Sequence, residues 1–319
     1  MVPRKINVHC FFGVDSSVQL IAKNQNKQKK PKNKAEIRIF CYFSLLMFVQ
    51  GTTIMELEII HQQQEVTQKS PLLFIHGMWH AAWCWEPHFM PYFAKNGFDT
   101  YAISLRNHGK SEHHKATWRV RISEYVEDVR QAVESIEGDP ILIGHSMGGF
   151  IVQKYLEKYP ASGAILLASV PPYGILGPTL KVLSKFPMTF LKANLTLNLR
   201  HIIADSASAK QLLFSESLPT EIANSYNSKM ENEAYIGYLD MMLFDLPKAK
   251  KIPATKMLVI GGEDDQVIST KDLQKTAKIY QADLKILPNI AHDMMLDTHW
   301  EAAAHEILSW LSNGVGQVS

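Results

Sequence analysis

Near the middle of the chain, residues 141–149 read Ile141-Leu142-Ile143-Gly144-His145-Ser146-Met147-Gly148-Gly149. Its three apolar residues predict a short buried strand, and a helical pattern over 150–158 follows. A serine on so sharp a strand-to-helix turn needs small neighbours two residues before and after it, because larger side chains would collide there. Gly144 and Gly148 meet this requirement. Ser146 is therefore predicted to be an exposed nucleophile beside a helix N-terminus, the alternative being a tight turn that merely contains a serine.

Outward from this turn, short apolar runs alternate with amphipathic helical patterns. The predicted strands cover 56–61, 71–76, 98–105, 141–143, 163–168, 256–260 and 283–287, and predicted helices cover 85–96, 123–137, 150–158 and 299–311. One more helix, between the last two strands, starts at Ser269, which has capping-box spacing to Asp272. Strands that are apolar throughout and alternate with helices predict an α/β fold, with a mostly parallel central sheet and helices on both faces. Such sheets place their chemistry at the carboxyl ends of the strands.

Residues 171–252 interrupt this alternation. They open with Pro171-Pro172-Tyr173-Gly174, contain helical patterns rich in Leu, Phe and Met, and show no clear strand. An insertion of this size between two strands predicts a helical cap over the site. The main domain is accordingly predicted to span 55–313, followed by a short tail at 314–319.

The general base is predicted from chain order. A serine hydroxyl is a weak nucleophile unless a base accepts its proton, and an acid must hold that base. In the known fold that carries its nucleophile on such a turn, an Asp or Glu and then the histidine follow the serine along the chain. The histidines after Ser146 are His201, His292, His299 and His305. His201 falls in the predicted cap, and the last two fall on the final helix. His292 lies in the loop after the last predicted strand and is predicted to be the base.

Three carboxylates follow the predicted strand at 256–260, namely Glu263, Asp264 and Asp265. The role of the acid is to fix the imidazole tautomer and to stabilise the imidazolium, without accepting a proton. Glu263 is interpreted as a loop residue. Position along the chain leaves both aspartates open as the acid.

The attacked carbonyl oxygen becomes an oxyanion, which needs two preorganised donors. The backbone N–H of Met147, directly after the serine, is predicted to be one of them. The N–H of Met78, in the loop after the strand at 71–76, is predicted to be the other. Two side chains of this loop, His76 and Trp79, are predicted to bind substrate. The alternatives are that His76 braces the loop and that Trp79 packs in the core.

Over 55–313 the sequence resembles the α/β-hydrolase family, in its serine hydrolase branch. The matching segments are His76-Gly77, 105–111, 144–148, 262–267 and His292. The acid loop is similar to the family pattern G-x-x-D-x-x-V, and this resemblance implies Asp265 rather than Asp264 as the acid. The implied catalytic set is thus Ser146, Asp265 and His292, with no metal and no cofactor.

Two segments are similar to different branches of that family. The segment 76–85 is similar to that of plant methylesterases and hydroxynitrile lyases, whereas 106–111 resembles the bacterial lysophospholipase and monoacylglycerol-lipase-like branch. The resemblance implies hydrolysis of a small-molecule carboxylic ester through an acyl-enzyme, and the Met- and Leu-rich cap favours an apolar acyl chain. The alternatives are a small methyl ester, a thioester, or a ligand-sensing or signalling protein that retains the triad.

The N-terminal segment differs in composition from the rest of the chain. Nine Lys or Arg and two acidic residues give residues 1–54 a charge of +7, which leaves −5 for 55–319 out of the total of +2. The larger part therefore has no basic surplus that would indicate a nucleic-acid partner. The Lys- and Asn-rich run 23–34 is predicted to be disordered. We interpret 1–54 as a disordered or non-native extension, with the working protein starting near Met55.

Membrane contact is expected only through the apolar stretch 37–49. This stretch has 13 residues, whereas a spanning helix needs roughly 20. The three cysteines, Cys10, Cys41 and Cys84, fit neither a disulfide framework nor a zinc site. A reducing, cytoplasmic compartment is expected, with membrane association as the alternative if 1–54 belongs to the native protein.

Overall fold

The computed structural model describes residues 55–63 and 69–313. The predicted disordered run 23–34, the apolar stretch 37–49 and the tail 314–319 lie outside these residues. Within the described ranges, no helix combines the length and the apolar content that crossing a bilayer requires.

The strands of the described chain form one sheet in the order β1-β3-β2-β4-β5-β6-β7. Their bounds are β1 Ile59–Gln62, β2 Leu72–Ile75, β3 Thr100–Ile103, β4 Ile141–His145, β5 Gly163–Leu167, β6 Met257–Gly262 and β7 Asp283–Leu287. β1 runs antiparallel to β3, and every other neighbouring pair is parallel. The predicted α/β fold with a mostly parallel sheet is confirmed.

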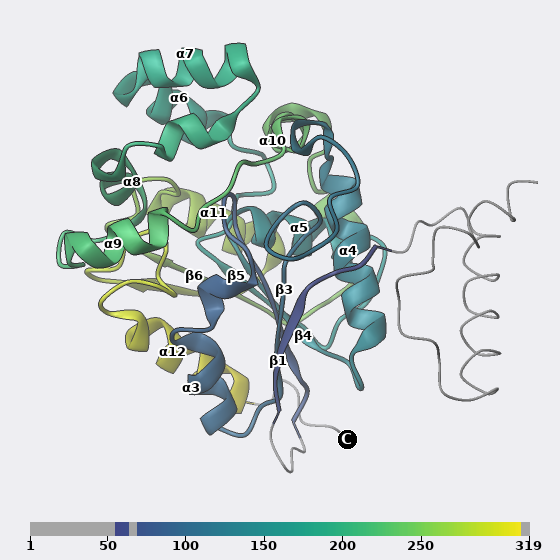
Figure 1. Cartoon of the computed structure of the whole chain (residues 1–319). Helices are drawn as coiled ribbons and strands as arrows, with labels where there is room; N and C mark the ends of the chain where they lie inside the picture. Colours follow the sequence, from purple (N-terminus) through teal and green to yellow (C-terminus); the bar gives the residue numbers. More distant parts are fainter. Residues whose placement is uncertain (1–54, 64–68, 314–319) are drawn as a thin grey trace, which may run out of the picture. The chain divides into compact units, whose positions relative to one another are not determined.

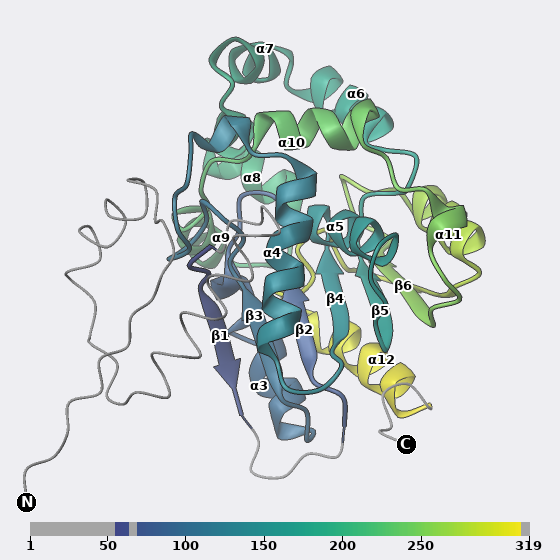
Figure 2. The ribbon, with the colours of Figure 1, turned by 90° about the vertical axis from the view of Figure 1, so that its right-hand side faces the viewer.

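Helices cover both faces of the sheet (Figure 1). The α-helices are α3 Phe89–Lys95, α4 Ile122–Ser135, α5 Met147–Leu156, α6 Leu176–Lys185, α7 Pro187–Thr196, α8 Ser206–Leu213, α9 Thr220–Asn227, α10 Tyr235–Leu239, α11 Thr270–Tyr280 and α12 Trp300–Ser312. Shorter helical segments are η1 Ala82–Trp85, η2 Thr117–Arg119, η3 Leu199–Ile203, η4 Asp240–Phe244 and η5 Ala249–Lys251. Helices α3 and α12 lie on one face, and α4 and α5 lie on the other (Figures 1 and 2).

β4 lies in the middle of the sheet, between β2 and β5. All five of its residues are buried, because helices cover both faces of the sheet. Its first three residues are accordingly apolar without alternation. Each fully buried aliphatic side chain here, such as Ile141 or Leu142, contributes about 1.5–3 kcal/mol to folding. This rigid strand leads directly into the turn that carries Ser146.

Two predicted helices begin well away from their predicted start in the structure, whereas α4 and α12 agree closely with theirs. The helix predicted at 85–96 is shortened to α3, which begins at Phe89 after the separate segment η1. The break lies at His88, whose φ of −137° and ψ of −63° are not helical. The helix predicted at 150–158 already begins at Met147. Its first turn contains Gly148-Gly149, whose low helix propensity hides the start of the helix.

Between β5 and β6 the chain forms helices α6 to α10 and no strand of the sheet. Helices α6, α7 and α10 lie together beyond one end of the strands, at the top of Figure 2. Several large apolar side chains of α6 and α7 are exposed, among them Leu180, Met188 and Leu195. Other side chains of the same helices, such as Val182 and Phe190, line a pocket beside Ser146.

Candidate active site

Ser146 lies on a strained turn between β4 and α5. Its backbone has φ 51° and ψ −114°, and positive φ is uncommon for a residue with a side chain. Its N–H donates to Leu167 O at 3.0 Å, which ties the turn to β5. A Cβ atom at Gly148 would collide with the carbonyl of Ile75, and one at Gly144 with the backbone of Gly148. Both glycines are therefore needed for the close approach of the backbone.

Three side chains from three loops meet at this turn. His292 Nε2 lies 2.9 Å from Ser146 Oγ, and His292 Nδ1 lies 2.8 Å from Asp265 Oδ2. One tautomer serves both hydrogen bonds, because a ring protonated at Nδ1 donates to the carboxylate and accepts from the hydroxyl. All three residues are buried, and Ser146 keeps 7% of its surface exposed. The structure thus brings together the three residues that the resemblance implied.

The loop after β6 holds the acid in place. Asp265 Oδ1 accepts from the N–H groups of Val267 at 2.7 Å and Ile268 at 2.8 Å. This leaves Oδ2 for His292. Asp264 is exposed and lines a different cavity. Asp265 is therefore the aspartate that the structure places against the imidazole.

The charges around His292 favour a basic imidazole. Burial lowers the pKa of His292, but the carboxylates of Asp265 and Asp293 outweigh burial and raise it above its ordinary 6.5. A general base is most effective when its pKa lies near the working pH. The ring is therefore suited to accept the serine proton near neutral pH.

The two predicted oxyanion donors flank Ser146. Met147 is the first residue of α5, where N–H groups have no partner within the helix. Met78 follows Gly77, and a Cβ atom on Gly77 would lie 3.0 Å from Ser146 Cβ, so this loop lies against the serine. Among the described residues, neither the Met78 N–H nor the Met147 N–H has a hydrogen-bond acceptor. Both groups are free to bind a carbonyl oxygen.

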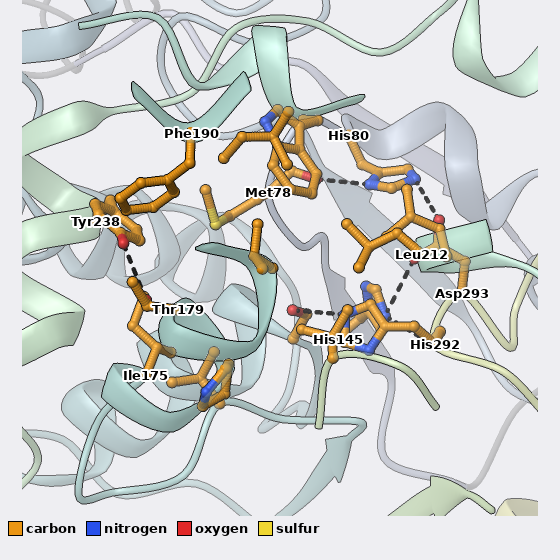
Figure 3. Close-up of a pocket in the computed structure, with 18 residues that line it drawn as sticks. Met78, His80, His145, Ile175, Thr179, Phe190, Leu212, Tyr238, His292 and Asp293 are labelled. Atoms are coloured by element: carbon orange, nitrogen blue, oxygen red, sulfur yellow. Dashed lines mark hydrogen bonds and ion pairs between the residues drawn. The ribbon is translucent and has the colours of Figure 1, made fainter. Parts of the chain in front are cut away.

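An apolar pocket opens beside Ser146 (Figure 3). Its walls come from the loops at the end of the sheet and from the helices inserted between β5 and β6. The main apolar wall residues are Val170, Ile175, Val182, Phe190, Leu212 and Leu213. Across the pocket from His292, the hydroxyl groups of Thr179 and Tyr238 lie 2.9 Å apart (Figure 3). Such a lining suits an apolar group and offers few polar contacts.

The two side chains predicted to bind substrate differ in position. Trp79 lines the pocket, but the prediction for His76 is wrong, since this residue is fully buried and outside the pocket lining. Its Nδ1 donates to Gly77 O at 2.8 Å, and its Nε2 accepts from Leu105 N at 3.0 Å. Burial, and then the charge of His108, lower the pKa of His76 to about 3. A neutral His76 thus braces the loops after β2 and β3.

A layer of buried polar groups behind His292 was missed from the sequence. Asp293 Oδ2 lies 3.1 Å from His80 Nε2, and Asp293 Oδ1 lies 3.6 Å from His145 Nε2. His80 Nδ1 donates to Met78 O at 2.8 Å. This layer therefore joins the loop that carries His292 to the loop 76–80, which we call the oxyanion loop (Figure 3). Burial raises the pKa of Asp293, but His80 outweighs burial and the pKa is lowered. The sequence did contain a signal for this layer, because Asp293 directly follows His292, the predicted base.

One cluster could offer ligands to a metal ion. His145, His292 and Asp293 bring possible ligand atoms within 4.8 Å of one another. However, the two ring nitrogens of His292 already face Ser146 and Asp265. A metal ion there would have to displace one of these hydrogen bonds, and the expected metal-free, cofactor-free site stays a prediction.

Two relatives correspond to the two branches that the sequence resembles. The chain is 26% identical over 238 residues to the monoacylglycerol lipase of Mycolicibacterium smegmatis, covering 69% of this chain and 80% of that protein. It is 29% identical over 126 residues to Methylesterase 1 of Arabidopsis thaliana, covering 38% of this chain and 47% of that protein. The second match is thus confined to part of both proteins.

A solved structure shares the fold. The esterase EaEST from Exiguobacterium antarcticum aligns with a TM-score of 0.64 at 16% identity, covering 81% of this chain and 96% of that chain. The sequence profile of the alpha/beta hydrolase family matches residues 72–306, more than two thirds of the sequence. The chain therefore belongs to the alpha/beta hydrolase family.

Proposed function

We propose that this protein hydrolyses carboxylic esters through an acyl-enzyme intermediate. One observation carries the proposal. The hydrogen bonds from Asp265 through His292 to Ser146 end beside an apolar pocket and two free backbone N–H groups. This arrangement supplies the nucleophile, the base, the orienting acid and the oxyanion donors that acyl transfer requires. The match to a monoacylglycerol lipase supports the same reaction class.

In the first half-reaction, Ser146 Oγ attacks the ester carbonyl carbon while His292 Nε2 takes the hydroxyl proton. The carbonyl oxygen becomes an oxyanion, which accepts hydrogen bonds from the N–H groups of Met78 and Met147. The bond between the carbonyl carbon and the alkoxy oxygen then breaks. His292 gives its proton to the departing alkoxide, so an alcohol leaves and the acyl group stays on Ser146.

In the second half-reaction, a water molecule gives a proton to His292 as its oxygen attacks the acyl carbon. The same two N–H groups stabilise the second oxyanion. The ester bond to Ser146 breaks, Oγ regains the proton from His292, and the carboxylic acid leaves. Asp265 stays ionised throughout and stabilises the imidazolium in both half-reactions.

We infer that the acyl group is apolar and of medium or long chain. The pocket lining is mainly aliphatic and aromatic, and most of its apolar residues belong to the inserted segment. We therefore interpret 171–252 as a cap that selects the substrate of a domain spanning 55–313. The cytoplasmic compartment expected from the cysteines stays a prediction; among the described residues, Cys84 is free and buried.

A labelling experiment and an ester panel test the proposal. A fluorophosphonate probe should label the wild-type protein at Ser146 and leave Ser146→Ala unlabelled. The p-nitrophenyl esters from acetate to palmitate should be hydrolysed by the wild type, with kcat/KM rising from acetate toward a medium or long chain. An unlabelled, inactive wild-type protein that is folded by circular dichroism would refute the proposal.

A small methyl ester is the second candidate substrate. It is supported by the partial match to Methylesterase 1 and by the similarity of 76–85 to that branch. The same panel separates the two candidates when methyl esters of small carboxylic acids are added. A preference for these esters over long-chain esters would favour the second candidate, and the nucleophile would be unchanged.

A further inference from the structure

A buried carboxylate of the inserted segment reaches the oxyanion loop. Glu233 lies between α9 and α10 and is fully buried. Its Oε2 accepts from the N–H of Trp79 at 3.2 Å, and its Oε1 accepts from Ala234 N at 2.6 Å and from Tyr125 OH at 2.8 Å. His108 Nε2 lies 3.3 Å from Oε2. Glu233 therefore joins the insertion to α4 and to the loops after β2 and β3.

The backbone of Trp79 is held from both sides by the same segment. Its N–H donates to Glu233, and its carbonyl accepts from Glu231 N at 2.8 Å. Trp79 has φ 67°, a left-handed conformation that costs a non-glycine residue free energy and persists only where its surroundings impose it. Trp79 directly follows Met78, whose N–H is a proposed oxyanion donor. The hydrogen bond from the Trp79 N–H fixes the peptide that joins Met78 to Trp79. It therefore restricts the residue whose own N–H, in the preceding peptide, is the proposed donor.

Charge strengthens this hold. Burial raises the pKa of Glu233, but His108 and the backbone and Tyr125 donors outweigh burial and lower it to about 2. Burial likewise lowers the pKa of His108, and Glu233 outweighs burial and raises it. Glu231 adds a second link, because its Oε2 accepts from the N–H of Gly109 at 3.0 Å. A charged acceptor makes a stronger hydrogen bond than a neutral one.

We propose that Glu233 is a positioning residue for the oxyanion donor of Met78. This inference rests on the proposed ester hydrolysis. Glu233 does not contact the reacting atoms. It holds Trp79 in the left-handed conformation, and this conformation keeps the N–H of the neighbouring Met78 directed toward Ser146. The oxyanion site is then completed by the insertion and not by the sheet alone. His80 holds the same loop from the other side, through the Met78 carbonyl.

Three variants test the role of Glu233. Glu233→Ala removes the acceptor, and Glu233→Gln keeps the side-chain length and one carbonyl acceptor. Asp240→Ala is the matched control, because Asp240 is also a buried carboxylate of the insertion, accepting from Ile122 N at 3.2 Å and binding Arg121 at 2.6 Å. Among the described residues, no hydrogen bond or ion pair joins Asp240 to the loop 76–80.

We expect kcat for a p-nitrophenyl ester to fall about 10- to 100-fold in Glu233→Ala, with KM little changed, because a small displacement of a catalytic group costs about that much. The affinity for a boronic acid, which forms a tetrahedral adduct with the serine, should fall by a similar factor. Glu233→Gln should give an intermediate kcat. Asp240→Ala should keep kcat, even where its melting temperature falls as far as that of Glu233→Ala.

Hydrogen exchange gives a readout that does not depend on turnover. The amides of 77–80 should exchange faster in Glu233→Ala than in the wild type and in Asp240→Ala. Full kcat and unchanged exchange in a folded Glu233 variant would overturn the proposal, as would an equal loss of kcat in Asp240→Ala. If the wild type hydrolyses no ester while Glu233→Ala still loosens the loop, the proposed function fails and the structural hold on the loop stands.

Discussion

The loops at the end of the sheet and the helices inserted between β5 and β6 contribute different parts of the site. Ser146, Asp265 and His292 follow β4, β6 and β7, so three parallel strands bring them to one edge. Half of the residues that line the pocket, together with Glu233, come from the insertion. The sheet loops thus hold the three polar side chains, and the insertion lines the pocket and contacts the loop that carries Met78.

The largest expected effect is the loss of the nucleophile. Ser146→Ala should lower kcat by about 10⁶-fold, the scale seen when a serine nucleophile is removed from a triad. Binding of an apolar inhibitor in the pocket should change little, because the walls remain intact. Steady-state kinetics and isothermal titration calorimetry measure the two effects. Residual activity near the wild-type level would mean that the sheet loops do not carry the chemistry.

A second prediction separates neighbouring aspartates of one sheet loop. Asp265→Asn should lower kcat by about 10⁴-fold, because an amide favours the wrong imidazole tautomer. Asp264→Asn is the matched control, since this side chain is exposed and lines another cavity. It should retain nearly full activity. A large loss in the Asp264 variant, with little loss in the Asp265 variant, would exchange their assigned roles.

A third prediction changes the insertion and leaves the triad intact. Val182→Trp should fill part of the pocket and lower kcat/KM for a long-chain ester, relative to acetate, by about 10- to 200-fold, the range that pocket contacts of this kind provide. Leu180→Trp is the control on the same helix, because Leu180 is 55% exposed and outside the pocket lining. Equal chain-length profiles for both variants would contradict the assignment of the pocket to the acyl chain.

The two regions also differ in how much the sequence reveals. The strand ends were predictable because buried parallel strands are continuous apolar runs, and the residues that follow them must share one edge. The glycines around Ser146 added a stereochemical signal. Asp265 was separated from Asp264 only by resemblance to a family pattern, since position alone left both open.

The contribution of the insertion had no comparable local signal. Glu233 meets Trp79 across 154 positions of sequence, and a lone glutamate between two helices reads as a solvated residue. The error at His76 has a related cause. Its place after β2 was predicted, but the direction of its side chain depends on the neighbouring loop, where Leu105 N–H provides the donor.

The smallest expected effect concerns the pH profile and again separates the two regions. His292 must be neutral to accept the serine proton, and Asp265 and Asp293 raise its pKa above the ordinary 6.5, so kcat/KM should fall as pH decreases through that raised value. Asp293→Asn removes a negative charge that favours the imidazolium, so the midpoint should move to lower pH. Val182→Trp should leave the midpoint unchanged while altering chain-length preference. The test is to measure kcat/KM from acid to neutral pH for the wild type, Asp293→Asn and Val182→Trp. If the midpoint moves as far in Val182→Trp as in Asp293→Asn, the insertion also controls the basicity of His292.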